Sequence, residues 1–145
     1  MVTKVWDNPA MFSIQVELPK NPLRFLNVYV IVTPEQNLLI DTGFNRIECR
    51  EALWGGIREL NLDLEKTSVF LTHLHSDHTG LAGDFVLQGC PIYMGRIDYA
   101  YLKEMKTENY LNGIEESFQK EGFPATISFL ISRPILRCGM GCLTH

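Results

Sequence analysis

The sequence predicts one layered domain of the α/β or α+β class, a sheet with flanking helices. Two patterns predict it, because apolar runs typical of strands alternate along the chain with segments whose apolar residues recur at helical spacing. The size agrees, since 145 residues with 46% hydrophobic and 21% charged residues suit a single folded core. A TIM barrel, which needs about 250 residues, is excluded.

The strands follow from these apolar runs. Residues 11–18 alternate apolar and polar side chains, as a half-buried strand does, and turn-forming residues follow them. Residues 25–32 are almost continuously apolar, which predicts a strand buried on both faces. Three further strands are predicted at residues 38–40, 67–72 and 91–94.

The helices follow from spacing. Residues 45–60 form a predicted helix with Asn45 as its cap. Its buried face is predicted to hold Ile47, Trp54, Ile57 and Leu60. Residues 96–106 place Ile97, Tyr101 and Met105 at i, i+4 and i+8, and residues 107–121 predict one more helix.

The last part of the chain differs in composition. All 17 acidic residues lie within the first 121 positions, and residues 126–145 combine an apolar stretch with a Gly- and Cys-rich end. We therefore expect residues 1–125 to form the domain and residues 126–145 to be an atypical tail, not native to the fold. A zinc site from Cys138, Cys142 and His145 is a weaker interpretation than a flexible terminus.

Charge and hydropathy exclude several classes. The formal net charge is 13 − 17 = −4, which disfavours binding to nucleic acid, since that affinity comes mostly from Lys and Arg. We find neither a signal-peptide pattern nor the roughly 18 consecutive apolar residues of a membrane span. We expect a cytoplasmic protein with reduced thiols, in which Cys49 and Cys90 are small core residues.

The chemistry of the chain is concentrated in one cluster, His73, His75, Asp77 and His78, which holds three of the four histidines. At the end of a strand, His73 and His75 are expected to point the same way, with Cα atoms roughly 6.6 Å apart. Two neutral imidazoles can then bind one divalent ion. Asp77 and His78 follow where the chain turns, so they can face a second ion. A solvated loop with incidental histidines is the less favoured alternative.

Such a pair of ions implies hydrolysis. Two ions about 3.5–4 Å apart hold a shared water and lower its pKa towards neutrality. A carboxylate beside that water, here Asp77, can orient it and carry a proton to the leaving group. Imidazole and carboxylate donors suit Zn²⁺, and Fe²⁺ or Mn²⁺ would also accept them.

The segment from His73 to Gly80, together with the upstream segment from Leu38 to Gly43, resembles the signature of the metallo-β-lactamase superfamily. The resemblance covers residues 12–121. It implies that His73 and His75 bind the first metal and that Asp77 and His78 bind the second. It also implies that Asp41 lies beside the site and positions the metal loop through hydrogen bonds, although an Asp-Thr-Gly turn alone would also explain this residue.

The resemblance also implies an αββα sandwich of which this chain supplies the first half. Members need three further ligands from the second half, and after His78 the chain offers only Asp84, Asp98 and His145. Asp84 and Asp98 are expected to be solvated surface residues, and a ligand role for His145 is weaker than a frayed terminus. We therefore expect the chain to be truncated or frameshifted.

Members of the superfamily are mostly hydrolases of esters, thioesters, lactones, β-lactams or phosphodiesters. The acidic charge and the absence of a secretory signal favour a small-molecule ester, thioester or lactone as substrate. The alternative is a non-catalytic metal-binding half-domain or an inert fragment. Such a half would leave one face of its sheet uncovered and would self-associate through it.

Overall fold

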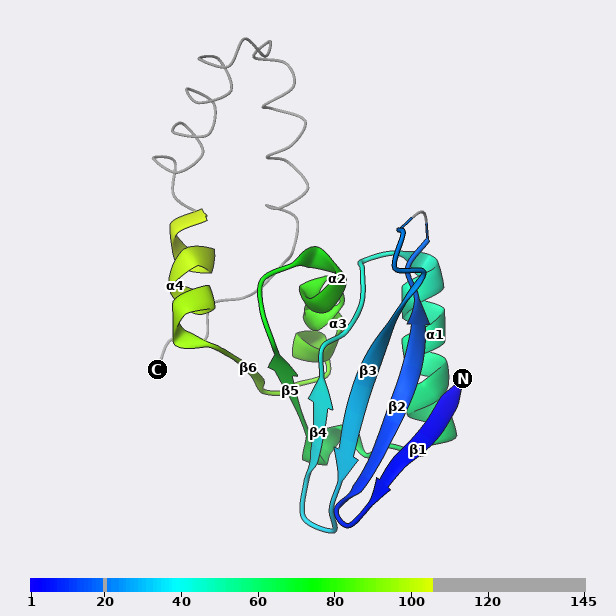
Figure 1. Cartoon of the computed structure of the whole chain (residues 1–145). Coiled ribbons are helices and arrows are strands. Elements are labelled where there is room, and N and C mark those ends of the chain that lie inside the picture. Colours follow the sequence, from blue (N-terminus) through cyan, green and yellow to red (C-terminus); the bar gives the residue numbers. More distant parts are fainter. Residues whose placement is uncertain (20, 106–145) are drawn as a thin grey trace, which may run out of the picture. The chain divides into compact units, whose positions relative to one another are not determined.

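A computed structural model of the protein describes residues 1–19 and 21–105. The described residues divide into two units, with the boundary between Gly95 and Arg96. In the described part of the first unit, six strands form one mixed sheet in the order β1-β2-β3-β4-β5-β6 (Figure 1). The sheet and its flanking helices confirm the predicted α/β class.

The strands run through the sheet in chain order, with neighbours in sequence also paired in space. Strands β1 to β4 form an antiparallel meander, whereas β4, β5 and β6 are parallel. The bounds are β1 (Val2–Asp7), β2 (Ala10–Glu17), β3 (Phe25–Val32), β4 (Asn37–Ile40), β5 (Thr67–Leu71) and β6 (Ile92–Met94). The pairing puts the carboxyl ends of β4 and β5 at one edge of the sheet.

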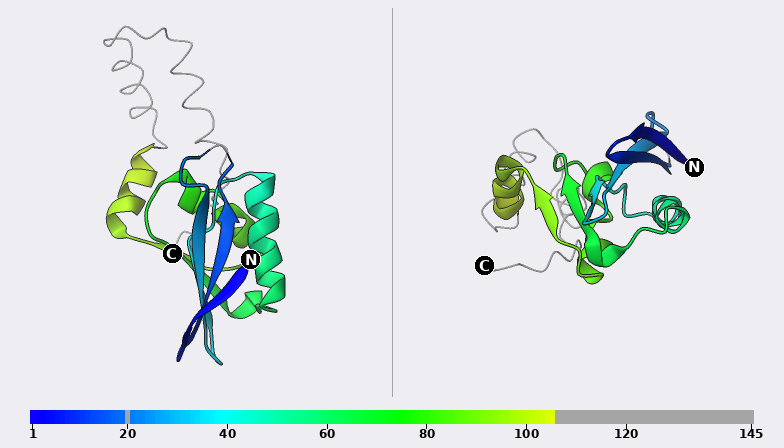
Figure 2. Two further views of the ribbon diagram at one scale, coloured as in Figure 1. Left: turned by 45° about the vertical axis from the view of Figure 1, so that its right-hand side comes forward. Right: turned by 90° about the horizontal axis from the view of Figure 1, so that it is seen from below.

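The two parallel pairings need crossover connections, and the helices supply them. The first crossover holds α1 (Ile47–Glu59) and the 3-10 turn η1 (Leu64–Lys66), and the second holds α2 (Ser76–Thr79) and α3 (Ala82–Leu87). Figures 1 and 2 show α1 and α3 on the same side of the sheet, where Trp54 stacks on Phe85 with ring centroids 5.2 Å apart.

The core fills the space between the sheet and these helices. From the sheet it takes Ile14, Val16, Val28, Val30, Leu39, Val69 and Leu71, and from the connections it takes Cys49, Leu53, Ile57, Leu81 and Phe85. Helix α1 comes close to β2, because a Cβ atom at Gly56 would lie 2.5 Å from Cγ2 of Ile14. Glycine inside this helix therefore permits the close packing of α1 on the sheet.

The other side of the sheet, which we call the outer sheet face, carries two rows of paired apolar side chains. The pairing register aligns Trp6, Met11, Ile31 and Leu38 in one row. It aligns Tyr29, Ile40, Phe70 and Tyr93 in the second row. Their exposed fractions include 61% for Trp6, 56% for Tyr93 and 37% for both Tyr29 and Phe70.

The prediction that residues 25–32 are buried on both faces is wrong. In β3 burial alternates, so that Val28 and Val30 are buried while Phe25 and Tyr29 are exposed. The cause is the one-sided helix layer of the first unit, which covers the core side of β3. Strand β3 therefore carries apolar side chains on both of its sides, but the described residues of this unit cover only the core side.

Two other predictions need correction, and one strand was missed. Strand β1 was not predicted from the sequence. Asn45 is not the cap of α1, since Arg46 occupies that position without a side-chain cap bond, and the Asn45 side-chain oxygen accepts from Nη2 of Arg50 at 2.7 Å. Ile47 is 59% exposed, and Cys49, Leu53 and Ile57 form the buried face.

The predicted helix at residues 96–106 is confirmed as α4 (Arg96–Met105), which belongs to the second unit. The predicted helix at residues 107–121 and the tail at 126–145 lie outside the described residues. Cys49 and Cys90 are free and buried as predicted, and burial raises the pKa of both thiols. Among the described residues, no helix has both the length and the apolar character that a membrane crossing requires.

Candidate metal centre

Asp41 lies at the carboxyl edge of the sheet, directly after β4. Because β4 and β5 are parallel, this position is next to the end of β5, and the Asp41 amide donates to the Phe70 carbonyl at 2.9 Å. The chain turns sharply here, with a φ of 65° at Asp41. The turn points the buried carboxylate at the loop that follows β5, where its Oδ1 accepts from the Thr72 amide at 2.9 Å.

The next residue, Thr42, holds the histidine loop by its backbone and its side chain. The amide and the hydroxyl of Thr42 both donate to the carbonyl of His78 at 2.8 Å. The same hydroxyl accepts from the Leu81 amide at 3.1 Å. Gly80 lets the two loops come this close, because a Cβ atom there would lie 2.5 Å from the backbone nitrogen of Asn45 and 2.7 Å from the carbonyl of Gly43.

The structure brings the three predicted histidines together. The rings of His73 and His75 have centroids 4.5 Å apart and are nearly perpendicular, and those of His73 and His78 have centroids 4.0 Å apart. Strand β5 ends at Leu71, so the expected alternation along an extended strand does not cause this grouping. A bend at residues 73–74 and the short helix α2, whose N-cap is His75, cause it instead.

The two carboxylates flank His78 on opposite sides of its ring. Nδ1 of His78 lies 2.8 Å from Oδ2 of Asp41, and Nε2 lies 3.5 Å from Oδ2 of Asp77. The side chains of His78 and Asp77 keep 18% and 14% of their surface exposed, so a ligand can reach them. Asp41 is thus within hydrogen-bonding distance of the predicted cluster, on the side away from Asp77.

The distance between the donor atoms of His78 and Asp77 suits two ligands of one divalent ion. Two ligands of a tetrahedral shell with bonds of about 2.1 Å lie about 3.4 Å apart, and the 3.5 Å between His78 and Asp77 is close to that spacing. Within residues 1–19 and 21–105, no three His, Cys, Asp or Glu side chains form a group that could hold an ion. The described residues therefore fit a metal by donor chemistry and, for His78 and Asp77, by spacing, and a full shell would need further ligands.

Asp84 is not the solvated surface residue that the sequence suggested. Its carboxylate accepts from Nε and Nη2 of Arg50 at 2.6 and 3.2 Å and lies 3.4 Å from Nε1 of Trp54. The hydrogen bond to Asp84 raises the pKa of the Arg50 guanidinium. This pair connects α1 to α3, so Asp84 is used in packing and is not offered to the histidine cluster.

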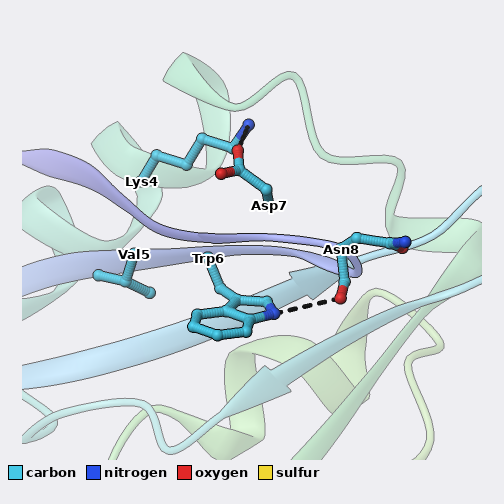
Figure 3. A pocket seen from close by; sticks show the side chains of 5 residues that line it. All are labelled: Lys4, Val5, Trp6, Asp7 and Asn8. Carbon is cyan, nitrogen blue, oxygen red and sulfur yellow. Dashed lines mark hydrogen bonds and ion pairs between the residues drawn. The ribbon is translucent and has the colours of Figure 1, made fainter.

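A separate hollow of about 370 Å³ lies on the β1–β2 hairpin, lined by Lys4, Val5, Trp6, Asp7 and Asn8 (Figure 3). Lys4 and Asp7 form an exposed ion pair of 2.8 Å, which lowers the pKa of Asp7. Nε1 of Trp6 donates to the Asn8 carbonyl at 3.1 Å. The residues that line this hollow include none of the cluster.

Sequence comparison decides the family. The profile of the Metallo-beta-lactamase superfamily matches residues 21–116, which include β3 to β6 and the whole histidine cluster. The chain belongs to the metallo-beta-lactamase superfamily. The resemblance inferred from the two sequence segments is confirmed.

Two curated thioesterases match about half of the chain. An atrochrysone carboxyl ACP thioesterase of Claviceps purpurea is 37% identical over 73 residues, which is 48% of this chain and 23% of that protein. Its counterpart from Emericella nidulans is 36% identical over 69 residues, or 48% of this chain and 22% of that protein. The matched segment thus spans less than a quarter of each relative's length.

Solved structures of the superfamily share the fold. A metallo-beta-lactamase family protein from Thermus thermophilus superposes with a TM-score of 0.66 at 26% identity, covering 79% of this chain and 38% of that one. A metallo-beta-lactamase from Cronobacter sakazakii has a TM-score of 0.57 at 15% identity, over 74% of this chain and 40% of that one. The likeness supports the predicted metallo-beta-lactamase-like sheet with flanking helices, and this chain matches under half of each structure.

Thr42 and Thr72 are the site residues that the sequence did not identify. Their hydroxyls contact the backbone of His78 and the carboxylate of Asp41, respectively. The available signal was their position, because each threonine directly follows or precedes a residue already assigned to the site.

Proposed function

We propose that the chain is the metal-binding half of a hydrolase that acts on a small-molecule ester, thioester or lactone, with a thioester as the first choice. The observation that carries this proposal is the grouping of three imidazoles and Asp77 at one edge of the sheet, on loops fixed by Asp41 and Thr42. Thioesterase names among the relatives support the substrate class.

In this proposal His73 and His75 hold one divalent ion, and Asp77 and His78 hold a second. Zn²⁺ suits these donors best, and Fe²⁺ or Mn²⁺ are the alternatives. When bound, such ions supply Lewis acidity and lower the pKa of a nearby water. Asp41 acts through hydrogen bonds on the ligand side chains, since it accepts from residues on the loop that carries them.

The residues of the chain have distinct tasks in the reaction. The carboxylate of Asp77 lies on the Nε2 side of His78, and its oxygen that does not hold the ion can take a proton from the attacking water. The water oxygen bonds to the acyl carbon, the carbon–sulfur bond breaks, and the proton passes from Asp77 to the leaving thiolate. Products are a carboxylic acid and a thiol, and no further reactant is consumed.

The proposal is tested on the purified full chain. Metal content is measured by elemental analysis, and hydrolysis is followed by the thiol released from a short acyl thioester, with a phenyl ester and a lactone as comparison substrates. About two ions per chain and turnover of the thioester are expected. A chain that retains one ion or none and hydrolyses none of the three substrates contradicts the proposal.

The second candidate is a non-catalytic metal-binding half-domain or an inert fragment that associates with a second copy of itself. The outer sheet face favours it, because eight apolar side chains from six strands lie there in two rows. Apolar patches of this kind usually mark an interaction surface. For the hydrolase we expect a small-molecule substrate, and in either case we expect no nucleic-acid or membrane partner and a cytoplasmic location.

A further inference from the structure

The hydroxyl of Thr72 lies among four polar atoms. Its Oγ1 is 3.0 Å from Oδ1 and 2.9 Å from Oδ2 of Asp41. It is also 3.0 Å from Nδ1 of His73 and 3.5 Å from Nδ1 of His78. Thr72 therefore connects the buried carboxylate of Asp41 to the ring of His73.

The protons in this network can be assigned by counting donors. A hydroxyl has one proton and two lone pairs, whereas a carboxylate only accepts. Because both oxygens of Asp41 lie within 3.0 Å of Oγ1, the Thr72 proton must point at Asp41. The hydroxyl can then only accept from His73, so Nδ1 of His73 must carry its hydrogen. In a neutral ring this leaves the lone pair on Nε2.

The same count applies to His78 without an intermediary. Its Nδ1 is 2.8 Å from Oδ2 of Asp41 and must donate, which leaves its lone pair on Nε2. The carboxylate of Asp41 thus determines the tautomer of one histidine in each of the two proposed pairs of metal ligands. It does so directly for His78 and through one hydroxyl for His73.

We propose that Thr72 is a positioning residue that connects the carboxylate of Asp41 to His73. It fixes the tautomer of His73 in which Nδ1 carries the proton and the lone pair of Nε2 is free to bind a metal. The inference rests on the proposed function, because a free Nε2 matters only if a metal is to be bound. Thr72 is itself exposed, so replacing its hydroxyl by a methyl group leaves no buried cavity.

The test is the tautomer of each histidine, read from two-bond nitrogen–proton correlation spectra of the full chain labelled with ¹⁵N-histidine. Spectra are recorded without metal at alkaline pH, where imidazoles are neutral. We expect His73 and His78 to carry their proton on Nδ1. In Thr72→Val, His73 should shift to the Nε2-protonated form that free histidine prefers, while His78 stays unchanged. Thr72→Ser should restore the wild-type pattern.

Thr79→Val is the matched control. It removes a threonine hydroxyl from α2, close to the same cluster, but that hydroxyl donates to the His75 carbonyl at 3.2 Å. The tautomer of His73 should therefore stay as in the wild type. An Nε2-protonated His73 in the wild type, or an unchanged His73 in Thr72→Val, overturns the inference. Should Thr72→Val fail to fold, an Nε2-protonated His73 in the wild type would still overturn the inference.

Zinc titration separates this inference from the proposed function. Competition with a chromophoric chelator should show Zn²⁺ affinity about 10-fold weaker in Thr72→Val and restored in Thr72→Ser. If the wild type binds no Zn²⁺ while both rings carry the expected protons, the proposed function fails and the tautomer assignment stands. If Zn²⁺ binds tightly but the metal-free spectrum shows His73 protonated on Nε2, the tautomer assignment fails and the proposed function stands.

Discussion

Asp41 and His78 are joined by a hydrogen bond of 2.8 Å across 37 residues of sequence. The carbonyl of His78 is held at the same time by Thr42, the residue after Asp41. Two consecutive residues of the loop after β4 therefore fix both the ring and the backbone of His78. The orientation of this imidazole is set by the fold before any ligand is bound.

Replacing the Asp41 carboxylate by an amide should weaken metal binding without removing a ligand. In Asp41→Asn the buried group loses its charge and its ability to accept from Thr72 and His78 together. The rings of His78 and, through Thr72, of His73 are therefore held less firmly. We expect affinity for Zn²⁺ to fall about 10- to 100-fold, the usual effect of losing such a partner. Chelator competition measures it.

Asp7→Asn is the control for this variant, because Asp7 is exposed on β1 and pairs only with Lys4 among the contacts that the structure describes. Zinc affinity there should match the wild type. Equal affinities in Asp41→Asn and the wild type would show that the carboxylate has no part in holding the loop.

Removal of a proposed ligand should have a larger effect. In His75→Ala the imidazole next to His73 is lost, so that His73 is the only ligand left of the pair proposed to hold the first ion. We expect metal retention at that position and thioester turnover to be abolished together. Elemental analysis and the thiol-release assay measure both, and full activity in this variant would place the active site elsewhere.

The ligand cluster could be predicted from the sequence because its members are neighbours in the chain. Three histidines and an aspartate within six residues must lie close together in any compact fold. The reason given for their convergence was nevertheless wrong, since β5 ends at Leu71 and a bend followed by α2 brings the rings together. A short helix of four residues leaves no periodic pattern from which to predict it.

Contacts between distant segments could not be predicted in the same way. No local pattern indicates that Thr72 meets Asp41, because that contact depends on the parallel register of β4 with β5. The predicted burial of β3 was wrong for a related reason. An apolar strand is compatible with a sheet covered by helices on both faces or on one face. Only the placement of the helices in the first unit distinguishes these two arrangements.

The outer sheet face should drive self-association. Phe70 and Tyr29 both pair with Ile40 across neighbouring strands and lie in the middle of one apolar row. A charge at Phe70 would have to be desolvated if a second copy covered this face, which is costly. In Phe70→Lys we expect the size-exclusion peak of the full chain to move from a dimer or larger species towards the monomer.

Gln36→Lys adds the same single positive charge as a control, on the exposed turn between β3 and β4 and outside the outer sheet face. Its elution should match the wild type. A wild-type chain that elutes as a monomer over a wide range of concentrations would contradict association through this face.

The paired glycines of α1 give a matched test of the packing. A Cβ atom at Gly55 meets nothing within 4 Å, whereas one at Gly56 meets Ile14 at 2.5 Å. Gly55→Ala should raise the free energy of unfolding by about 0.5–1 kcal/mol through helix propensity. Gly56→Ala should lower it by about 1–3 kcal/mol through overpacking. Urea denaturation followed by circular dichroism measures both, and a stabilised Gly56→Ala would mean that α1 does not lie this close to β2.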